Sequence, residues 1–423
     1  MKPEVKMKSA LAGILVFQLL GASALGQAGS SHTLRIVFAG DIMGHDSQIN
    51  AARIEAAGNL NTPEQAGSSE QAGSSVAEES TARADGAGRI LSAAGDSTLD
   101  HYDYTRCFHN LAPYIEEADI AVGNLEVTLG GPPYKGYPRF SSPDELGEAL
   151  FGAGFDVLVN ANNHALDRGE QGLERTLSVI RKEGMIQTGV FSSPHQRELH
   201  YPLILEKNGI LLAMLNYTYG TNGLRPDTPN VINYLDTLLI RQDIRKARLV
   251  NPDFIIAVVH WGLEYQRDEN ETQEALARFL FAEGVDAVIG SHPHVIQPIK
   301  YERDGARIVR PVVYSLGNFV SNQRDRYRNG GIIVGLDLEK VVGSDHSPAD
   351  LTRITGIDYL PVYVHKPREG KRNVFELVPG GIPDGMLSRI GFTADEKESY
   401  LEFCRDTREH LPEIPLASFP AGQ

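Results

Sequence analysis

Five short apolar runs in this chain are each followed by residues that can bind metal ions or carry protons. The runs span residues 34–38, 120–122, 157–159, 254–259 and 285–289, and Asp, Asn, Glu or His follows each one closely. Such runs, alternating with helical patterns, are typical of parallel strands in an α/β sheet. Open α/β sheets place ligand sites at the carboxyl ends of their strands, so the five polar segments are expected to meet there. The alternative for any one segment is a helix cap or a turn.

The segment after the fifth run places two histidines around a proline, His292-Pro293-His294. Neutral imidazole nitrogen is a favoured ligand of first-row transition metals. Proline fixes its own φ and restricts the residue before it, which favours a stiff presentation of both imidazoles. Alone the triplet is weak evidence, and its weight comes from the other four strand ends.

Six motifs occur in a fixed order: Asp41 in Gly-Asp-Ile-Met, Asn124-Leu125-Glu126, Asn162-Asn163-His164 with Asp167, His260-Trp261-Gly262 with Glu264, Gly290 through His294, and Tyr314 through Phe319. With these motifs the chain resembles the CapA-type bacterial capsule-synthesis (poly-γ-glutamate) family, which is similar in turn to the calcineurin-like metallophosphoesterases. The resemblance covers residues 33–335 apart from one insertion. It implies a four-layer α/β/β/α sandwich, whereas periodicity alone supports an α/β fold with mostly parallel strands.

The resemblance also implies a metal centre. By position in the family's motifs, the ligands are Asp41, Asn163, His260, His292 and His294. Mixed nitrogen and oxygen ligation suits Zn²⁺, Mn²⁺ or Fe and disfavours Mg²⁺, so we expect one or two ions of the first group. Asn124, Glu264 and Asn318 are expected to support these ligands or to contact substrate.

Two positions depart from the phosphoesterase pattern. Met43 stands where histidine is expected, and thioether sulfur is a poor ligand for hard divalent ions. Asn124 replaces the bridging aspartate. Residues i and i+2 of a strand share a face, so Glu126 is a candidate for the missing carboxylate. His45 could compensate for Met43, or it could be a surface histidine.

His164 is the candidate general acid. In the phosphoesterase pattern its equivalent protonates the leaving group, and an unperturbed imidazole exchanges protons near neutral pH. Asp167 lies three residues further on. It could orient His164, or it could cap the helix expected to begin near Gly169.

These residues favour an exported metal-dependent hydrolase. Its substrate would be a phosphoester, or an amide of a poly-γ-glutamate-like or peptide polymer of the cell envelope, since metal ions polarise carbonyl and phosphoryl oxygens alike. The alternative is a non-catalytic protein that binds or assembles an anionic envelope polymer in a degenerate cleft. The departures at Met43 and Asn124 favour the alternative, whereas the retained His164 favours the enzyme.

Bulk composition narrows location and partners. The formal net charge of −15 argues against nucleic acid as a partner. Residues 1–26 read as a secretory signal peptide, with an apolar stretch too short for a comfortable membrane span. We therefore expect a periplasmic or extracellular protein of a bacterium without a membrane span after cleavage; the alternative is an uncleaved anchor. The residues do not indicate an oligomeric state.

The chain divides into a main domain over 33–345 and an extension over 346–423 that is expected to complete the sandwich. Residues 51–98 contain Glu-Gln-Ala-Gly-Ser-Ser twice in succession and few aromatic side chains, which predicts a flexible insertion. Helices are expected from a capping box at Ser142, over 169–184, and over 271–283 with Gly284 as the C-cap. Strands are expected over 209–218, 354–364 and 373–378. Cys107 and Cys404 lie in segments with no evident reason to meet, so we expect no disulfide.

Overall fold

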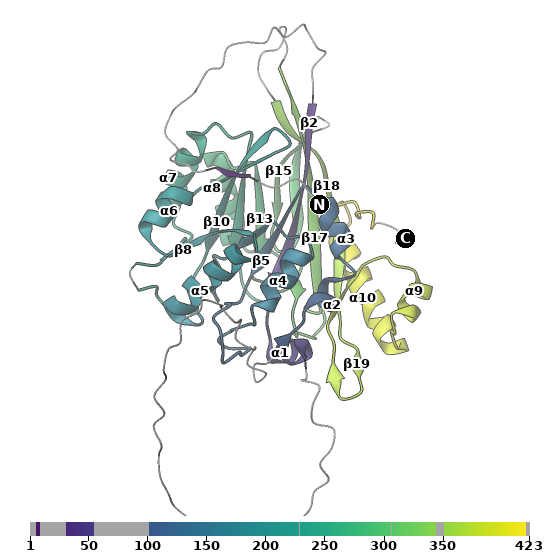
Figure 1. The fold of residues 1–423 in the computed structure, drawn as a ribbon. Coiled ribbons are helices and arrows are strands. Elements are labelled where there is room, and N and C mark those ends of the chain that lie inside the picture. Colours follow the sequence, from purple (N-terminus) through teal and green to yellow (C-terminus); the bar gives the residue numbers. More distant parts are fainter. Residues whose placement is uncertain are drawn as a thin grey trace, which may run out of the picture.

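The computed structural model describes residues 6–8, 31–54, 101–227, 229–305, 307–343 and 351–419 (Figure 1). Most strands belong to one hydrogen-bonded path with the order β1-β9-β10-β12-β13-β15-β18-β17-β2-β5-β6-β7. The path has two halves. They join where β15 meets β18 through a single register pair, Ile308 with Ile354.

The first half contains mostly parallel strands. Its members are β9 Leu203–Lys207, β10 Ile210–Thr218, β12 Phe254–His260, β13 Ala287–Ser291 and β15 Arg307–Val313, with β1 Lys6–Lys8 and β14 Ile299–Asp304 at its edges. Strands β10, β12, β13 and β15 run parallel, whereas β1, β9 and β14 pair antiparallel. Consequently β10, β12 and β13 bring their carboxyl ends to the same edge of the sheet.

The second half mixes the two strand directions. Its members are β18 Leu351–His365, β17 Gly330–Val341, β2 Ser31–Ile42, β5 Ile120–Leu125, β6 Val157–Val159 and β7 Ile186–Thr188, with β16 Asn318–Val320 beside β2 and β21 Glu376–Pro379 beside β18. Strands β2, β5, β6 and β7 run parallel. The long β17 and β18 pair antiparallel, and β17 is also antiparallel to β2. The strands that precede the motifs are thus the parallel ones.

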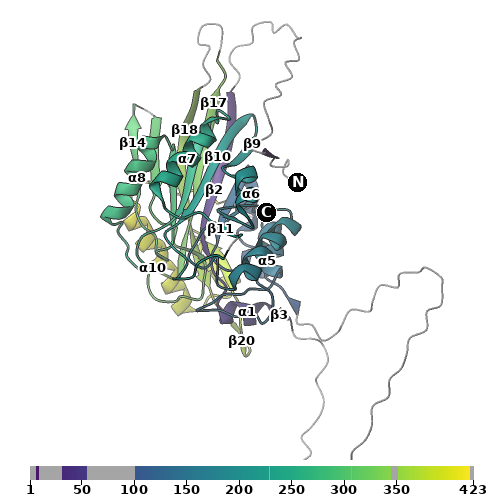
Figure 2. The same ribbon diagram turned by 90° about the vertical axis from the view of Figure 1, so that its left-hand side faces the viewer.

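Buried side chains divide the fold into four layers, as the resemblance implied. One apolar core contains inward residues of both halves, for example Phe38 of β2 and Met214 of β10, and lies between the sheets. A second core covers the outer face of β2 and β5, and a third covers the outer face of β10 and β12. Helices α2 Thr105–Phe108, α3 Ala112–Glu117, α4 Glu145–Gly152 and α5 Gly169–Lys182 pack on the second core, and α7 Thr237–Arg248 and α8 Glu271–Glu283 pack on the third (Figures 1 and 2).

The C-terminal helices close one end of the central core. Helices α9 Asp384–Arg389 and α10 Ala394–His410 contribute Leu387, Tyr400 and Phe403 to the core between the sheets. The remaining elements are short: α1 Asp46–Ala52, α6 Pro194–His200, and the strand pairs β3 Arg53–Ile54 with β4 His101–Tyr102, β8 Val190–Phe191 with β11 Val231–Ile232, and β19 Arg368–Glu369 with β20 Arg372–Asn373.

Two segments predicted from composition fall largely outside the described residues. Of the expected signal peptide over 1–26, only β1 is described, and of the expected insertion over 51–98, only residues 51–54 are. Those four residues end α1 and form β3. Within the described part of the chain, none of the helices combines the length and apolar character that crossing a membrane requires.

All three predicted helices are present, but the cap predicted for one of them is wrong. Helix α5 begins at Gly169, and α8 ends before Gly284, whose φ of 95° is the left-handed C-cap that glycine favours. The capping box predicted at Ser142 is wrong. Helix α4 begins at Glu145 behind Asp144, and the buried Ser142 hydroxyl has no hydrogen-bond partner.

Candidate metal centre

The polar side chains that the sequence singled out lie at the carboxyl ends of five strands and at the start of β16. Asp41 lies at the end of β2 and His260 at the end of β12, while Glu126 and His292 each follow directly after the last residue of β5 and β13. Asn163 and His164 follow β6, and Asn318 begins β16 next to Asp41. All seven side chains are buried. The edge where these strands end therefore forms one enclosed polar site.

Two groups of metal-ligand type share a single carboxylate. Glu126, His260 and His292 form one triad, and Asp41, Glu126 and His294 form the other; within each triad the ligand atoms all lie within 4.8 Å of one another. Oε1 of Glu126 is 3.5 Å from Nε2 of His260 and 3.8 Å from Nε2 of His294. Glu126 is thus shared by both triads, as expected of a carboxylate that takes the place of the one lost at Asn124.

The triads contain polar atoms that the chain itself does not satisfy. Both carboxylate oxygens of Glu126 and Nδ1 of His292 are buried without a hydrogen-bond partner among the described residues. A buried polar atom in that state is costly and calls for an explanation such as an ion. Imidazole nitrogen with carboxylate oxygen is a donor set that suits divalent transition metals. The residues present therefore fit one or more divalent ions.

The protonation states of the cluster also favour the binding of divalent ions. Burial and the neighbouring imidazoles hold the pKa of His260 far below its usual range, and burial lowers the pKa of His292 to about 3, so both rings are neutral ligands. Burial acts to raise the pKa of Asp41, but His294 and Asn124 outweigh it and keep this carboxylate ionised. Burial and the charge of Asp41 raise the pKa of Glu126. A cation between the carboxylates would remove that repulsion.

The two histidines around Pro293 adopt backbone conformations that non-glycine residues rarely use. The φ angles are 105° for His292 and 59° for His294. Hydrogen bonds hold the turn: the Pro293 carbonyl accepts from the Tyr265 amide at 2.8 Å, and the His294 carbonyl accepts from Nδ2 of Asn318 at 3.3 Å. Asn318 therefore supports the backbone of His294.

Asparagine side chains lie within hydrogen-bond distance of residues in both triads. Nδ2 of Asn124 donates to Oδ1 of Asp41 at 2.8 Å, and Oδ1 of Asn163 lies 2.8 Å from Nε2 of His260. Asn162 donates to Oδ1 of Asn124 and to the Leu125 carbonyl. Asn124 thus supports Asp41, as expected, and Asn163 places its amide oxygen beside the first triad.

His164 is held by Asp167, which decides between the two alternatives for this carboxylate. Oδ2 of Asp167 lies 2.6 Å from Nδ1 of His164 and accepts from the Phe140 amide at 2.7 Å. Helix α5 has Arg168 as its N-cap residue and no side-chain cap, so Asp167 does not cap it. The Phe140 ring packs edge-on against His164 with 4.7 Å between centroids. These contacts leave Nε2 of His164 as the nitrogen that can exchange a proton.

Met43, and His45 as the residue that could compensate for it, have other roles. Met43 is buried in the outer apolar core with α2, where a thioether packs well. His45 precedes α1; its Nδ1 lies 3.0 Å from Oε1 of Gln48 and accepts from the Asn322 amide at 3.2 Å. His45 is partly buried and belongs to neither triad, so it does not take the place of Met43 there.

Sequence reasoning missed Tyr219, which covers the first triad. Its ring centroid lies 4.5 Å from that of His292, and its plane is parallel to His260 at 6.2 Å. Burial together with the charges of Glu264 and Glu126 raises the pKa of Tyr219 to about 12. Glu264 is exposed and acts on the site through its charge. A signal was present, because Tyr219 directly follows β10, another parallel strand.

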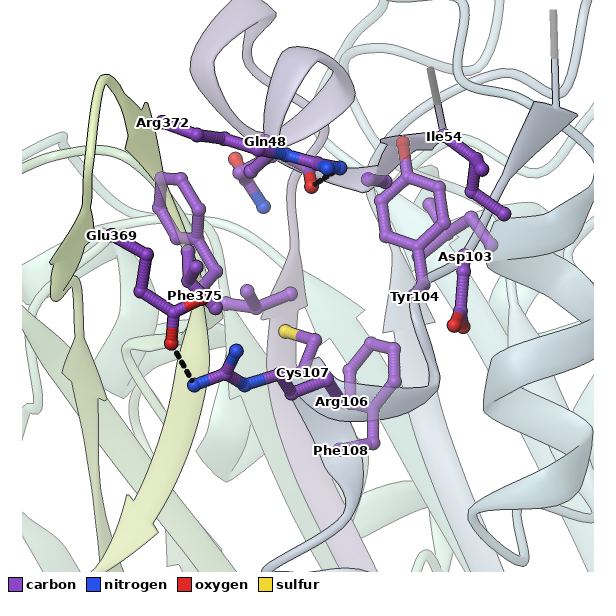
Figure 3. Close-up of a pocket in the computed structure, with 15 residues that line it drawn as sticks. Gln48, Ile54, Asp103, Tyr104, Arg106, Cys107, Phe108, Glu369, Arg372 and Phe375 are labelled. Carbon is purple, nitrogen blue, oxygen red and sulfur yellow. Dashed lines mark hydrogen bonds and ion pairs between the residues drawn. The ribbon is translucent and has the colours of Figure 1, made fainter. Parts of the chain in front are cut away.

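Another hollow, of about 210 Å³, lies between α1, α2 and the loop before β21 (Figure 3). Arg106 in its wall reaches Glu369 at 2.7 Å and Glu376 at 2.5 Å, and Cys107 lies beside it. None of the triad residues lines this hollow. Cys107 and Cys404 are both unpaired, so the prediction of no disulfide is confirmed, and burial raises the pKa of the Cys107 thiol.

Comparison with known proteins gives a consistent answer. The family model described as bacterial capsule synthesis protein PGA_cap matches residues 35–323. The capsule biosynthesis protein CapA of Bacillus anthracis is 29% identical over 53% of this chain and 56% of its own length. The PGA biosynthesis protein CapA of Bacillus subtilis is 31% identical over 55% of this chain and 61% of its own length. The chain thus matches somewhat more than half the length of these relatives.

Among solved structures, the sulfate thiohydrolase SoxB of Thermus thermophilus, in complex with glycerol, aligns with 72% of this chain and 46% of its own. The TM-score is 0.36 and the sequence identity 15%, a likeness too weak to assign an activity.

Proposed function

The chain belongs to the bacterial capsule synthesis protein family, and from that membership we propose that it is an exported, metal-dependent hydrolase of the cell envelope. The bond cleaved is a phosphoester, or an amide of a poly-γ-glutamate-like or peptide polymer. The names of two relatives, which refer to capsule and PGA biosynthesis, support a substrate in capsule formation. The lysine-rich start and apolar stretch within residues 1–26 support export.

One observation carries the proposal: two donor triads share Glu126, whose carboxylate oxygens have no hydrogen-bond partner in the described part of the chain. A site that only bound a polymer would not need two imidazole–carboxylate triads with unsatisfied atoms. Two ions, Zn²⁺, Mn²⁺ or Fe, would be held by Asp41, Glu126, His260, His292 and His294, with Asn163 as a further oxygen ligand. When bound, such ions activate water and polarise the attacked oxygen.

The remaining steps belong to the chain's own residues. Asp167 accepts from Nδ1 of His164 at 2.6 Å and so fixes the tautomer and the direction of the ring. In the doubly protonated ring, Nε2 of His164 carries the proton that passes to the leaving group, and the neutral ring that remains keeps its proton on Nδ1. Tyr219 covers the first triad and limits the entry of bulk water.

The test is metal-dependent turnover. The purified chain is stripped with chelator, reloaded with Mn²⁺ or Zn²⁺, and given p-nitrophenyl phosphate, bis(p-nitrophenyl) phosphate and γ-glutamyl p-nitroanilide. We expect hydrolysis of one substrate class only with metal present, and its loss in His292→Ala. A folded, metal-loaded protein that cleaves none of them would sink the proposal. The non-catalytic polymer-binding alternative would then be favoured, and retention of purified poly-γ-glutamate by the protein would support it.

A further inference from the structure

A largely apolar hollow adjoins the candidate metal centre. It measures about 460 Å³, within the usual range for small-molecule sites. The start of α8 forms its polar rim. Its apolar walls consist of Tyr219, Leu235, Trp261, Leu263 and Leu276.

The hollow and the metal centre are neighbours, linked by adjacent residues of the chain and by Tyr219. His260 of the first triad is followed directly by Trp261 and Gly262, which line the hollow. Tyr219 belongs to both, because it lines the hollow and lies 4.5 Å from His292, centroid to centroid. One aromatic side chain therefore separates the hollow from a metal-ligand histidine.

Most polar groups in the lining are already committed to partners in the chain. Nε1 of Trp261 donates to the Tyr314 carbonyl at 2.8 Å. Asn270 and Gln273 satisfy each other's backbone amides in a capping box, and Nε2 of Gln273 donates to Gln297 at 2.9 Å. Among the lining residues only Glu271 carries a charge. Water in such a space has few partners, so an apolar group would displace it favourably.

We propose that this hollow is a subsite of the metal centre that holds an alkyl or aryl group of the substrate, attached next to the bond that is cleaved. The inference rests on the proposed function. It narrows the substrate to an amphipathic phosphoester or amide, with a polar group at the triads and an apolar substituent beyond Tyr219. A polymer that carried only ionised carboxylates would leave the hollow unfilled.

One binding experiment separates the subsite from the proposed function. Calorimetry measures how non-hydrolysable n-alkylphosphonates, from methyl to hexyl, bind to the Mn²⁺-loaded chain. Each methylene that enters an apolar site tightens binding roughly fourfold, so three buried methylenes would give roughly 60-fold. Leu263 is 53% exposed, so Leu263→Asp should fold normally while it charges the wall. We expect this variant to lose the chain-length effect and to keep methylphosphonate binding.

Leu249→Asp is the matched control, because Leu249 is 84% exposed and does not line the hollow. It should behave as wild type. Metal-dependent binding of every phosphonate with equal affinity would overturn the subsite and leave the proposed function standing. A chain-length effect that survives His292→Ala or metal removal would also overturn it, because the hollow would then act independently of the centre. No binding of any phosphonate by metal-loaded protein would count against both claims.

Discussion

Two polar clusters that include residues of β2 differ in how far hydrogen bonds within the described part of the chain satisfy their charged groups. In the first cluster, Arg35 donates to Asp337 at 2.8 Å and to both carboxylate oxygens of Asp358 at 2.8 and 2.9 Å. In the second cluster, Asp41 shares a triad with Glu126, whose two carboxylate oxygens have no hydrogen-bond partner among the described residues. The first cluster ties β2, β17 and β18 together with groups of the chain alone. The second needs a bound ion to supply partners for its buried carboxylate oxygens. This need is what separates a functional cluster from a structural one.

The largest predicted effect is on turnover, and it comes from a change beside the cluster that contains Glu126. His164→Asn removes the proton donor beside the open cluster and should lower turnover about 10²–10⁴-fold. Metal content should stay unchanged, because His164 belongs to neither triad. Steady-state kinetics with metal analysis of the same preparation checks both. Full activity would reject the role of general acid, and loss of metal would make His164 a ligand.

The same comparison predicts opposite effects on stability without metal. Arg35→Met leaves two carboxylates without their shared partner and should lower the free energy of unfolding by about 2 kcal/mol. Glu126→Gln removes a buried carboxylate that has no hydrogen bond, so stability should be unchanged or higher by up to about 2 kcal/mol. Urea unfolding in chelator measures both variants. A larger loss of unfolding free energy in Glu126→Gln than in Arg35→Met would contradict this difference between the clusters.

The pH dependence of metal binding should reveal Glu126. Its pKa is raised in the folded protein by burial and by Asp41, so in the metal-free state a proton remains on it above the usual carboxyl range. Binding must release that proton, and affinity should therefore fall as pH falls, at most about tenfold per pH unit for one proton. His292, with its pKa lowered to about 3, should not contribute near pH 6.5.

The linked effect on metal-free stability has the opposite sign. A carboxyl whose folded pKa is raised destabilises the fold at high pH, and that penalty disappears as pH falls through the folded pKa. Wild type should therefore gain stability relative to Glu126→Gln as pH is lowered. For metal binding, calorimetry in buffers of different ionisation enthalpy counts the protons that the chain releases when the ion binds. An affinity that falls only around pH 6.5, as for an ordinary histidine, would contradict this assignment.

The smallest effect is expected for a change in residues 55–98, none of which belongs to either cluster. Replacing residues 55–98 by a short Gly/Ser linker should leave the melting temperature nearly unchanged, since the sequence of this stretch offers little apolar surface to bury. At this chain size 1 kcal/mol corresponds to roughly 2–4 °C. A fall of more than about 10 °C in a melting experiment would show that the stretch packs on the core.

Much of the site could be predicted because strand ends carry a local signature. An apolar run followed by Asp, Asn or His is visible in the chain, and parallel strands bring such ends together. The spacing of Asn124 and Glu126 was informative for the same reason, since residues i and i+2 point to one side. Both side chains are buried at the centre, Asn124 against Asp41 and Glu126 in both triads.

The features that could not be predicted depend on contacts between distant segments. The left-handed φ of His292 and the cover that Tyr219 provides require β10, β12 and β13 to lie in register. The single pair that joins β15 to β18 has no local signal. The failed capping box at Ser142 shows the same limit, because its segment hydrogen-bonds back to Thr128 instead of starting the helix.

Metal titration of the chelator-stripped chain, followed by calorimetry and elemental analysis, tests the shared carboxylate most directly. If Glu126 is shared by two ions, wild type and Arg35→Met should each bind two divalent ions per chain. Glu126→Gln, which alters both triads at once, should lose affinity on the order of a hundredfold or more. Wild type without bound metal, or Glu126→Gln with unchanged stoichiometry and affinity, would contradict it.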